Sequence, residues 1–529
     1  MVIGVTCGMS APYVAAQLDF VLDQIGACTA NNSTVAGAAT ADATRPRPLC
    51  DFTPVLVGFN PVALARDIPI EMWSNRPEGG THTFRDVARR MEAAADDAII
   101  INPVVGPESL CGSTRMKGGT ATKIILETVF GAALESVLSA SEPAADTGPT
   151  TTTTNTNTSI DTTSIDTALY RYADAITAAY APSTELGRLI DICGTSLRST
   201  HGRIFYLGGD PVAAIVGFID ASEMRPTFGA PADETRGFAE HGWESLGNVE
   251  GDLTGVGPLY KVDFASFRNV VMQTLTADDT VVALHCESSG GATDALVSQA
   301  RAETGCQIVR LSVSRRQKHG TAGSESAAAV ATAAASATAT VAINWVGECD
   351  ICLPHGTPTS IFYSCPSRND AGDAGDGDFS YRYDGYGALC LKVALNALST
   401  GAQVMAGRTL SNRMINVTPS NHKLFLRCTG LVKLLANMNG AGAPAIGEDE
   451  ARRCLIRAIY ETDDATRVEE LLSGTPVSEY IKEANRRGSV QRANKLLPIA
   501  ILVAVKRGTV SEAKRALATH TTVREALEC

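Results

Sequence analysis

The stretch "GPESLCGSTRMKGGTATK" at residues 106–123 decides how the chain around it is read, because glycines, hydroxyls and cations crowd together where a helix is expected to begin. The apolar run "DDAIIINP" at 96–103 stands just before it and predicts a buried strand. A helical pattern follows from Ser113 to about Ala140. Strand, polar loop and helix in this order predict a unit whose loop could hold an anion at the helix N-terminus.

Two cations, Arg115 and Lys117, are expected in the first turn of that helix. Positive side chains there oppose the helix dipole, and a bound anion would offset that cost because Arg can hold two oxygens of a phosphate or carboxylate. The alternative is that the cations pair with Glu108 or Glu127 at the surface. The glycines at 118–119 weaken the helix without a packing gain, so the composition favours the anion.

A second loop of the same kind stands near the start of the chain. The run "VIGV" at 2–5 predicts a strand, Thr6, Gly8 and Ser10 follow in a loop, and Pro12 suits the first turn of a helix. Gly8 would let a ligand approach the backbone, and helix amides with two hydroxyls could hold a phosphate. An ordinary capped strand–helix turn is the alternative for this loop.

Short apolar runs alternate with helical patterns up to residue 382, which is typical of βαβ units around a parallel sheet. Further strands are predicted at 53–59, 202–209, 280–286, 306–313 and 341–346. A helix is predicted at 83–95 and another at 166–199, and from residue 383 onward the pattern is helical throughout. The sequence therefore predicts an α/β fold of two parallel-sheet units followed by an all-helical cap.

Segments rich in small and polar residues interrupt this framework. They lie at 28–49, 141–165, 318–340 and 366–378. Such segments bury too little apolar surface to offset their ordering entropy, so we expect disordered insertions and a disordered linker. The expected domains are 1–140 and 166–382, joined by the linker 141–165, and then the cap at 383–529.

Length and composition limit the functional classes. With 529 residues, 44% of them hydrophobic, the chain has material for two or three domains. A formal net charge of −12 argues against nucleic acid or an anionic membrane as the partner. The start of the chain lacks a signal-peptide pattern and no apolar run of about 18 residues predicts a membrane span. We therefore expect a cytoplasmic protein whose 14 cysteines are reduced thiols.

Cysteine and histidine spacing gives only half of a zinc pattern. Cys349, Cys352 and His355 stand close together, with Cys365 further on. A structural zinc site needs four ligands at suitable spacing. We therefore predict no metal site and no cofactor.

Five stretches, taken in order, resemble one family. They are "VIGVTCGMSAPYVAAQLD" (2–19), "TPVLVGFNPVALARDIPIEMW" (53–73), "INPVVGPESLCGSTRMKGGTATKIILETVF" (101–130), "ALNALSTGAQVMAGRTLSNRMINVTPSNHKLF" (394–425) and "LLPIAILVAVKRGTVSEAKRAL" (496–517). This series resembles the glucokinase regulatory protein family and its relatives, the N-acetylmuramic acid 6-phosphate etherases. Both groups are built from sugar isomerase (SIS) domains, so the resemblance implies two tandem SIS domains and a helical cap.

The resemblance also implies a function. The regulatory proteins are not enzymes; they bind fructose 6-phosphate or fructose 1-phosphate and, in that state, control the inhibition of glucokinase. A hexose phosphate and a glucokinase or related hexokinase are therefore the expected partners, in carbohydrate metabolism, in the cytoplasm and also the nucleus. The family has one more strand–loop–helix unit before "VIGV", so residues 1–140 are expected to be the C-terminal part of a truncated first SIS domain.

The same resemblance assigns roles to single residues. The ligand-binding residues that it implies are Thr6, Gly8, Ser10, Thr114, Arg115 and Lys423. The first three match the phosphate loop of the family and the next two match its second ligand-contacting turn. The last stands in "PSNHKLF" and matches the cap lysine that reaches the sugar phosphate.

A different function is implied by "DASEMRPTFG" at 220–229, which resembles the etherase stretch that contains a catalytic glutamate. Glu223 matches that glutamate, and Glu240 is a candidate for a second acid. The residues of this second candidate site are Glu223, Ser288 and Ser289. A lyase acting on an amino-sugar phosphate is therefore the alternative function, and a carboxylate paired with Arg225 at a helix end is the structural alternative.

Overall fold

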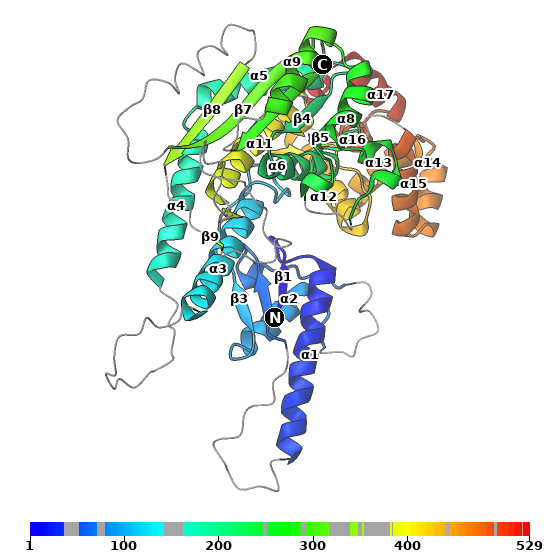
Figure 1. Cartoon of the computed structure of the whole chain (residues 1–529). Coiled ribbons are helices and arrows are strands. Elements are labelled where there is room, and N and C mark those ends of the chain that lie inside the picture. Colours follow the sequence, from blue (N-terminus) through cyan, green and yellow to red (C-terminus); the bar gives the residue numbers. More distant parts are fainter. Residues whose placement is uncertain are drawn as a thin grey trace, which may run out of the picture. The chain divides into compact units, whose positions relative to one another are not determined.

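The computed structural model describes the chain apart from several internal segments and the C-terminal residue. The described residues are 1–35, 52–70, 73, 80–141, 162–246, 251–286, 291–316, 339–346, 352–353, 381–382, 385–440, 442, 444–490, 495–520 and 522–528. They form two compact units, Met1–Phe130 and Gly131–Cys529 (Figure 1). The predicted insertion at 366–378 lies outside the described residues, as do most of the other three.

The first unit contains a three-stranded parallel sheet in the order β1-β2-β3. Its strands are β1 (Val2–Val5), β2 (Pro54–Val57) and β3 (Ile99–Ile101). Its helices are α1 (Pro12–Val35), the short η2 (Val62–Leu64), α2 (Phe84–Ala93) and α3 (Lys117–Ser141). All three strands lie where the sequence predicts them.

Helices cover both faces of this sheet, and β2 shows why. On one face Leu56 packs with residues of α1 and α2, and on the other Val55 and Val57 pack with Ala121 and Ile125 of α3. A strand that is buried on both faces reads as a continuous apolar run, which is how the sequence predicts it.

The expected segments 28–49 and 141–165 extend too far, into helices. Residues 28–35 continue α1, and 162–165 open the first helix of the second unit. Neither short run contains Gly or Pro, so nothing in it breaks a helix, although its small polar residues resemble a loop.

The second unit contains a five-stranded parallel sheet in the order β5-β4-β6-β7-β8 (Figure 1). Its strands are β4 (Ile204–Gly208), β5 (Thr235–Ala239), β6 (Thr280–Cys286), β7 (Gln307–Arg316) and β8 (Ala339–Val346). The edge strand β5 is missing from the sequence prediction. Its sequence, "TRGFA", contains no apolar run that would predict a strand. Arg236 is accommodated in this strand because its guanidinium donates to the backbone carbonyls of Pro258, Leu259 and Lys261.

Helices also cover both faces of this sheet. They include α4 (Thr162–Tyr180), α5 (Ser183–Arg198), α6 (Pro211–Ser222), α7 (Met224–Phe228), α8 (Phe264–Ser266), α9 (Gly291–Thr304) and α11 (Gly385–Met405). Phe205 and Leu207 of β4 pack with Phe267 and with Leu296 of α9, whereas α11 packs against α4, α5 and α6. The single helix predicted at 166–199 is two helices, because Pro182 stands between α4 and α5.

The helix α11 lies in the segment predicted as the cap, yet it covers the sheet. By length and hydropathy alone it could span a membrane, and it is the one such helix in the part of the chain that the structure describes. Within this helix, 72% of the apolar window is buried inside the unit. Its packing against α4, α5 and α6 therefore accounts for its apolar composition.

The C-terminal part, which we call the lid, is a helical bundle. Its helices are α12 (His422–Asn439), α13 (Glu448–Tyr460), α14 (Ala465–Gly474), α15 (Val477–Val490), α16 (Leu496–Lys506), α17 (Val510–Thr519) and α18 (Val523–Glu528). The apolar helix α16 is buried at its centre, against α12, α13, α17 and α18.

The prediction of helices alone after residue 383 is wrong at one place. The strands β11 (Thr409–Leu410) and β12 (Arg413–Met414) pair antiparallel before the first lid helix. Two further short strands, β9 (Cys352–Leu353) and β10 (Tyr381–Arg382), also pair antiparallel. Strands of two residues carry no recognisable pattern in a sequence.

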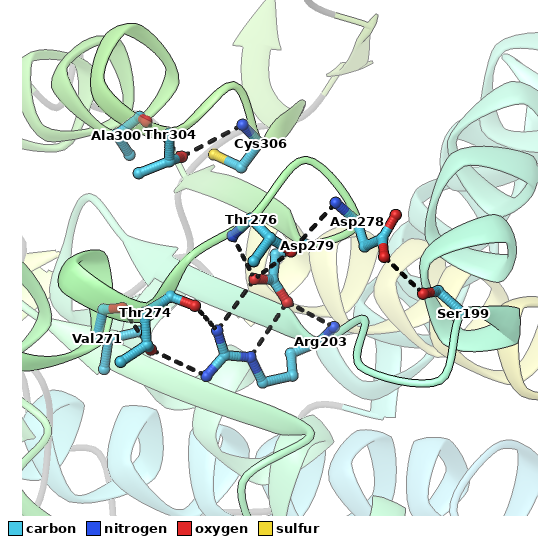
Figure 2. Close-up of polar contacts among 10 residues, drawn as sticks. All are labelled: Ser199, Arg203, Val271, Thr274, Thr276, Asp278, Asp279, Ala300, Thr304 and Cys306. Carbon is cyan, nitrogen blue, oxygen red and sulfur yellow. Dashed lines mark hydrogen bonds and ion pairs between the residues drawn. The ribbon is translucent and has the colours of Figure 1, made fainter.

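A buried ion pair joins the starts of β4 and β6 at the amino end of the second sheet. Figure 2 shows Asp279, which is fully buried, between the guanidinium of Arg203 at 3.0 Å and the backbone N–H of Thr276 at 2.8 Å. Arg203 also donates to the carbonyl of Thr274 at 2.6 Å. These charges lie at the amino end of the sheet, whereas the polar loops follow the carboxyl ends of the strands. We therefore assign the ion pair a structural role, in which it joins β4 to β6.

A second buried carboxylate, Asp220 at the end of α6, joins three elements. It accepts hydrogen bonds from the Tyr206 hydroxyl of β4 at 3.1 Å, and from Asn396 at 2.8 Å and Ser399 at 3.0 Å, both on α11. Asp220 is 2% exposed. The first residue of the "DASE" stretch therefore has a structural role, which the sequence analysis does not predict.

Replacing Asp220 should destabilise the chain strongly. Asp220→Ala leaves three buried donors without their acceptor, which should lower the free energy of unfolding by about 3 kcal/mol or more. Ser222→Ala is the matched control, because its exposed hydroxyl donates only to the carbonyl of Ile219 and its loss should change stability by about 0.5 kcal/mol or less. Urea-induced unfolding of both variants measures the difference, and equal effects would contradict this role.

Candidate functional site

The loop after β1 is a tight turn built around Thr6. Its backbone N–H donates to the carbonyl of Val57 at 2.9 Å, and its hydroxyl oxygen accepts the N–H of Ser10 at 3.3 Å. Met9, with φ 46°, is fully buried beneath the loop. Because the Thr6 oxygen accepts within the turn, its proton can donate outward. Helix α1 begins at Pro12, as predicted.

The glycine of this loop has no packing reason to be a glycine. A Cβ added to Gly8 would meet only the Ser10 hydroxyl, at 3.6 Å, among the described residues. By contrast, a Cβ on Gly58, in the neighbouring loop after β2, would lie 2.8 Å from the side chain of Met9. Gly58 thus supports the loop from below, and sequence reasoning missed it. Close approach of a ligand remains the explanation that we favour for Gly8.

The second candidate turn, at 113–118, differs from the prediction in where its helix starts. Helix α3 begins at Lys117, so Thr114 and Arg115 precede it. Thr114 is exposed, whereas Arg115 is buried with 8% of its surface exposed. The helix starts late because the carboxylate of Glu108 accepts the backbone N–H groups of Lys117 at 2.9 Å and Gly118 at 2.6 Å.

The expected anion at this helix is therefore partly supplied by the chain itself. Glu108, which the structural alternative pairs with a cation, binds backbone amides of α3. Glu127 pairs with Lys123, one turn away on the same helix. A phosphate near this turn would thus have the buried guanidinium of Arg115 rather than the first amides of α3.

The two candidate stretches meet at Gly118. A Cβ on this residue would lie 3.0 Å from the sulfur of Cys7 and 3.2 Å from a carboxylate oxygen of Glu108. The expectation that this glycine brings no packing gain is therefore wrong. Its missing side chain lets α3 approach the loop after β1, so that Thr6 and Arg115 belong to loops in contact.

Lys423 is placed only by its backbone. It is the second residue of α12, and Asn421 caps this helix by accepting the N–H of Leu424 at 2.9 Å. The side chain of Lys423 lies outside what the structure describes. Its role at a phosphate stays a prediction.

In the second unit, the predicted site residues are not assembled by the described structure. Ser288 and Ser289 lie outside the described residues. Glu223 is half-buried at the junction of α6 and α7, and Glu240 is exposed directly after β5. The pairing of Glu223 with Arg225, which is the structural alternative, is not among the ion pairs of the described residues.

Sequence reasoning missed a carboxylate that lies at the strand ends of this unit. Asp210 follows β4, and its two oxygens accept the N–H of Ala213 in α6 at 2.8 Å and the N–H of Cys286 in β6 at 2.7 Å. Adjacent strand ends at the helix N-terminus are where open α/β sheets bind anions. The signal was available, because Asp before Pro at a strand–helix turn is typical of a helix cap.

A buried histidine lies next to the loop after β4. A Cβ on Gly209 would be 2.5 Å from the ring of His285, which is 5% exposed. Its Nε2 lies 3.6 Å from Asp294, and Asp294 pairs with Arg310 at 2.5 Å. Burial lowers the pKa of His285, and Arg310 adds to this effect while Asp294 opposes it.

The described part of the chain contains no candidate metal site. No group of three His, Cys, Asp or Glu side chains comes together there. Cys349, His355 and Cys365, which form most of the half zinc pattern, lie outside that part.

Two family models match parts of the second unit. The family model described as "Glucokinase regulatory protein, second SIS domain" matches residues 180–346. The model described as "C-terminal lid domain of glucokinase regulatory protein" matches residues 411–527. The first match contains all five strands of the second sheet, and the second contains the lid helices.

Relatives extend the likeness to the whole chain. The glucokinase regulatory protein of Homo sapiens is 29% identical over 535 residues, covering 100% of this chain and 68% of its own. That of Xenopus laevis is 26% identical over 533 residues, covering 99% of this chain and 69% of its own. The N-acetylmuramic acid 6-phosphate etherase of Gloeothece citriformis (strain PCC 7424) is 26% identical over 282 residues, covering 53% and 75%.

Parallel sheets with helices on both faces, polar loops after their strands and a helical lid define an SIS-domain protein. The resemblance read from the sequence is confirmed. The chain is similar to the glucokinase regulatory protein family along its whole length.

The lowered pKa of His285 predicts a loss of stability in acid. Its ordinary value is 6.5, so as the pH falls below 6.5 the unfolded chain takes up this proton before the folded chain does. Unfolding is then favoured by at most about 1.4 kcal/mol per pH unit from this residue. His285→Gln should therefore lose less stability than the wild type between about pH 7 and pH 5 in urea titrations. Parallel losses in both proteins would contradict the assignment.

Proposed function

We propose that the chain is a regulatory protein that binds a hexose phosphate, fructose 6-phosphate or fructose 1-phosphate, and then controls a glucokinase or related hexokinase by inhibiting it. The observation that carries the ligand proposal is the contact at Gly118, which joins the loop after β1 to the turn before α3. The relatives that match along the whole chain are named as regulators, which supports a role other than catalysis.

The chemistry of the first unit suits a phosphate group. Thr6 can donate its hydroxyl proton, Gly8 and Ser10 flank the start of α1, and Arg115 brings a guanidinium into the neighbouring turn. Because Glu108 already accepts the first amides of α3, the phosphate is expected at the N-terminus of α1. Exposed Thr114 would contact the sugar, and Lys423 would add a charge from the lid.

The partner and setting are proposals from the same resemblance. A ligand-dependent regulator should inhibit its kinase to a different extent with fructose 6-phosphate or fructose 1-phosphate than without a ligand. Steady-state assays of a glucokinase with added chain test this, and inhibition that is absent under all three conditions would remove the kinase from the proposal. We place the protein in the cytoplasm and nucleus.

One observation favours a second candidate function. Glu223 is half-buried at a helix junction, and no ion pair of its carboxylate is present among the described residues. A carboxylate of this kind could transfer protons in an etherase-like elimination from an amino-sugar phosphate. Release of lactate from N-acetylmuramic acid 6-phosphate, lost in Glu223→Gln, would support this lyase over the regulator.

Replacing the lid lysine tests the sugar-phosphate site directly. Lys423→Ala removes a charge-assisted hydrogen bond to phosphate, which should weaken fructose 6-phosphate binding by about 10- to 100-fold. At a concentration of 100 times its dissociation constant, the ligand should stabilise the wild type by about 2.7 kcal/mol in thermal unfolding, and much less in the variant.

Lys433→Ala is the matched control for this variant, because Lys433 is an exposed lysine on the same helix. Its ligand-induced shift should equal that of the wild type. A shift that survives Lys423→Ala unchanged would contradict the proposed site.

A further inference from the structure

The segment "GFNPVALAR" at residues 58–66 follows β2 directly and contains η2; we call it the brace. It contacts residues 6–10, the loop after β1 that is proposed to hold the phosphate. Both segments belong to the first compact unit, and all of their residues are described. The hydrogen bonds and packing of the brace decide which groups of the loop a ligand can reach.

The brace takes up the carbonyl groups of the loop. Three consecutive carbonyls accept a hydrogen bond from it: that of Cys7 from the N–H of Phe59 at 3.0 Å, that of Gly8 from the side chain of Asn60 at 3.4 Å, and that of Met9 from the N–H of Arg66 at 3.1 Å. Carbonyl oxygens carry a partial negative charge and repel an anion. A carbonyl that is directed at the brace is not directed at a bound phosphate, so these bonds remove a repulsive contact.

The amide groups of the same loop stay open. Among the described residues, the N–H groups of Cys7 and Gly8 have no hydrogen-bond partner. The hydroxyl of Thr6 keeps its proton for a ligand, because its oxygen accepts the N–H of Ser10. Successive free N–H groups in a turn form an anion-binding concavity. The loop therefore offers donors to a ligand as long as the brace holds its carbonyls.

The loop is fixed on the brace by the side chain of Met9. This residue has φ 46° and is fully buried, and its N–H donates to the carbonyl of Thr6 at 2.9 Å. A Cβ on Gly58 would lie 2.8 Å from both Cγ and Cε of Met9. Gly58 cannot easily move away, because its N–H donates to the carbonyl of Ile101 at 3.0 Å. A methyl group at Gly58 would therefore displace Met9, and the loop with it.

We infer that Gly58, Met9 and Asn60 are positioning residues for the phosphate, which hold the loop after β1 with its carbonyls toward the brace and its amides open. This inference rests on the proposed function, because it presumes that the phosphate binds at this loop. Donors that are already in place bind an anion more tightly than donors that must be ordered on binding. Displacing Met9 then weakens ligand binding without removing any group that contacts the ligand.

A double-mutant cycle tests this inference. Gly58→Ala adds a methyl group against Met9, and Met9→Ala removes the two carbon atoms that it would meet. Calorimetry on the whole chain measures the affinity for fructose 6-phosphate in both backgrounds. We expect Gly58→Ala to weaken binding by about 10-fold alone, and by less than about 2-fold in the Met9→Ala background.

Gly194→Ala is the matched control, because it presses a methyl group against another methionine, Met405, in the second unit. It should lower the free energy of unfolding in urea, as Gly58→Ala does, but leave the affinity unchanged. If Gly58→Ala does not fold, Asn60→Ala replaces it. This variant removes the bond to the Gly8 carbonyl at a half-buried side chain, and should weaken binding by about 3-fold.

The outcomes separate the inference from the proposed function. A wild type that binds fructose 6-phosphate, together with an affinity that Gly58→Ala leaves unchanged or lowers equally in both backgrounds, would overturn the inference and leave the site intact. If Asn60→Ala is the variant measured, an unchanged affinity would overturn it in the same way. A wild type that binds neither fructose 6-phosphate nor inorganic phosphate would overturn both.

Discussion

The absence of a side chain at Gly118 is the constraint on which the candidate site depends. A Cβ there would lie 3.0 Å from the sulfur of Cys7, so only glycine lets α3 approach the loop after β1. Parallel pairing of β1, β2 and β3 brings the strand ends to one edge, and this contact then joins two of their loops. Two loops that are far apart in the sequence thereby lie in contact.

Carboxylates of the chain itself satisfy much of the polar backbone that such a fold leaves open. Glu108 accepts the first amides of α3, and Asp210 does the same for α6 while joining it to β6. Asp220 ties α6 to α11 in the core of the second unit. A carboxylate thus already lies at the strand ends of the second unit, which favours the first unit for a phosphate ligand.

Most of the fold could be predicted from the sequence, and the exceptions have physical reasons. Buried strands such as β2 and β6 read as continuous apolar runs, whereas the edge strand β5 has none. At the candidate site, Thr6 and Arg115 could be named from local composition and resemblance. The roles of Glu108 and Asp220 could not, because they depend on partners that only the folded chain brings near.

Hydrogen–deuterium exchange of the whole chain with and without fructose 6-phosphate would test the central claim most directly. Ligand contacts with backbone amides and the ordering that follows slow exchange where the ligand binds. The account predicts protection at residues 6–10, at 113–118 and in the first turn of α12. Protection confined to the strand ends around Asp210 and Cys286, or at the junction near Glu223, would contradict it and move the site to the second unit.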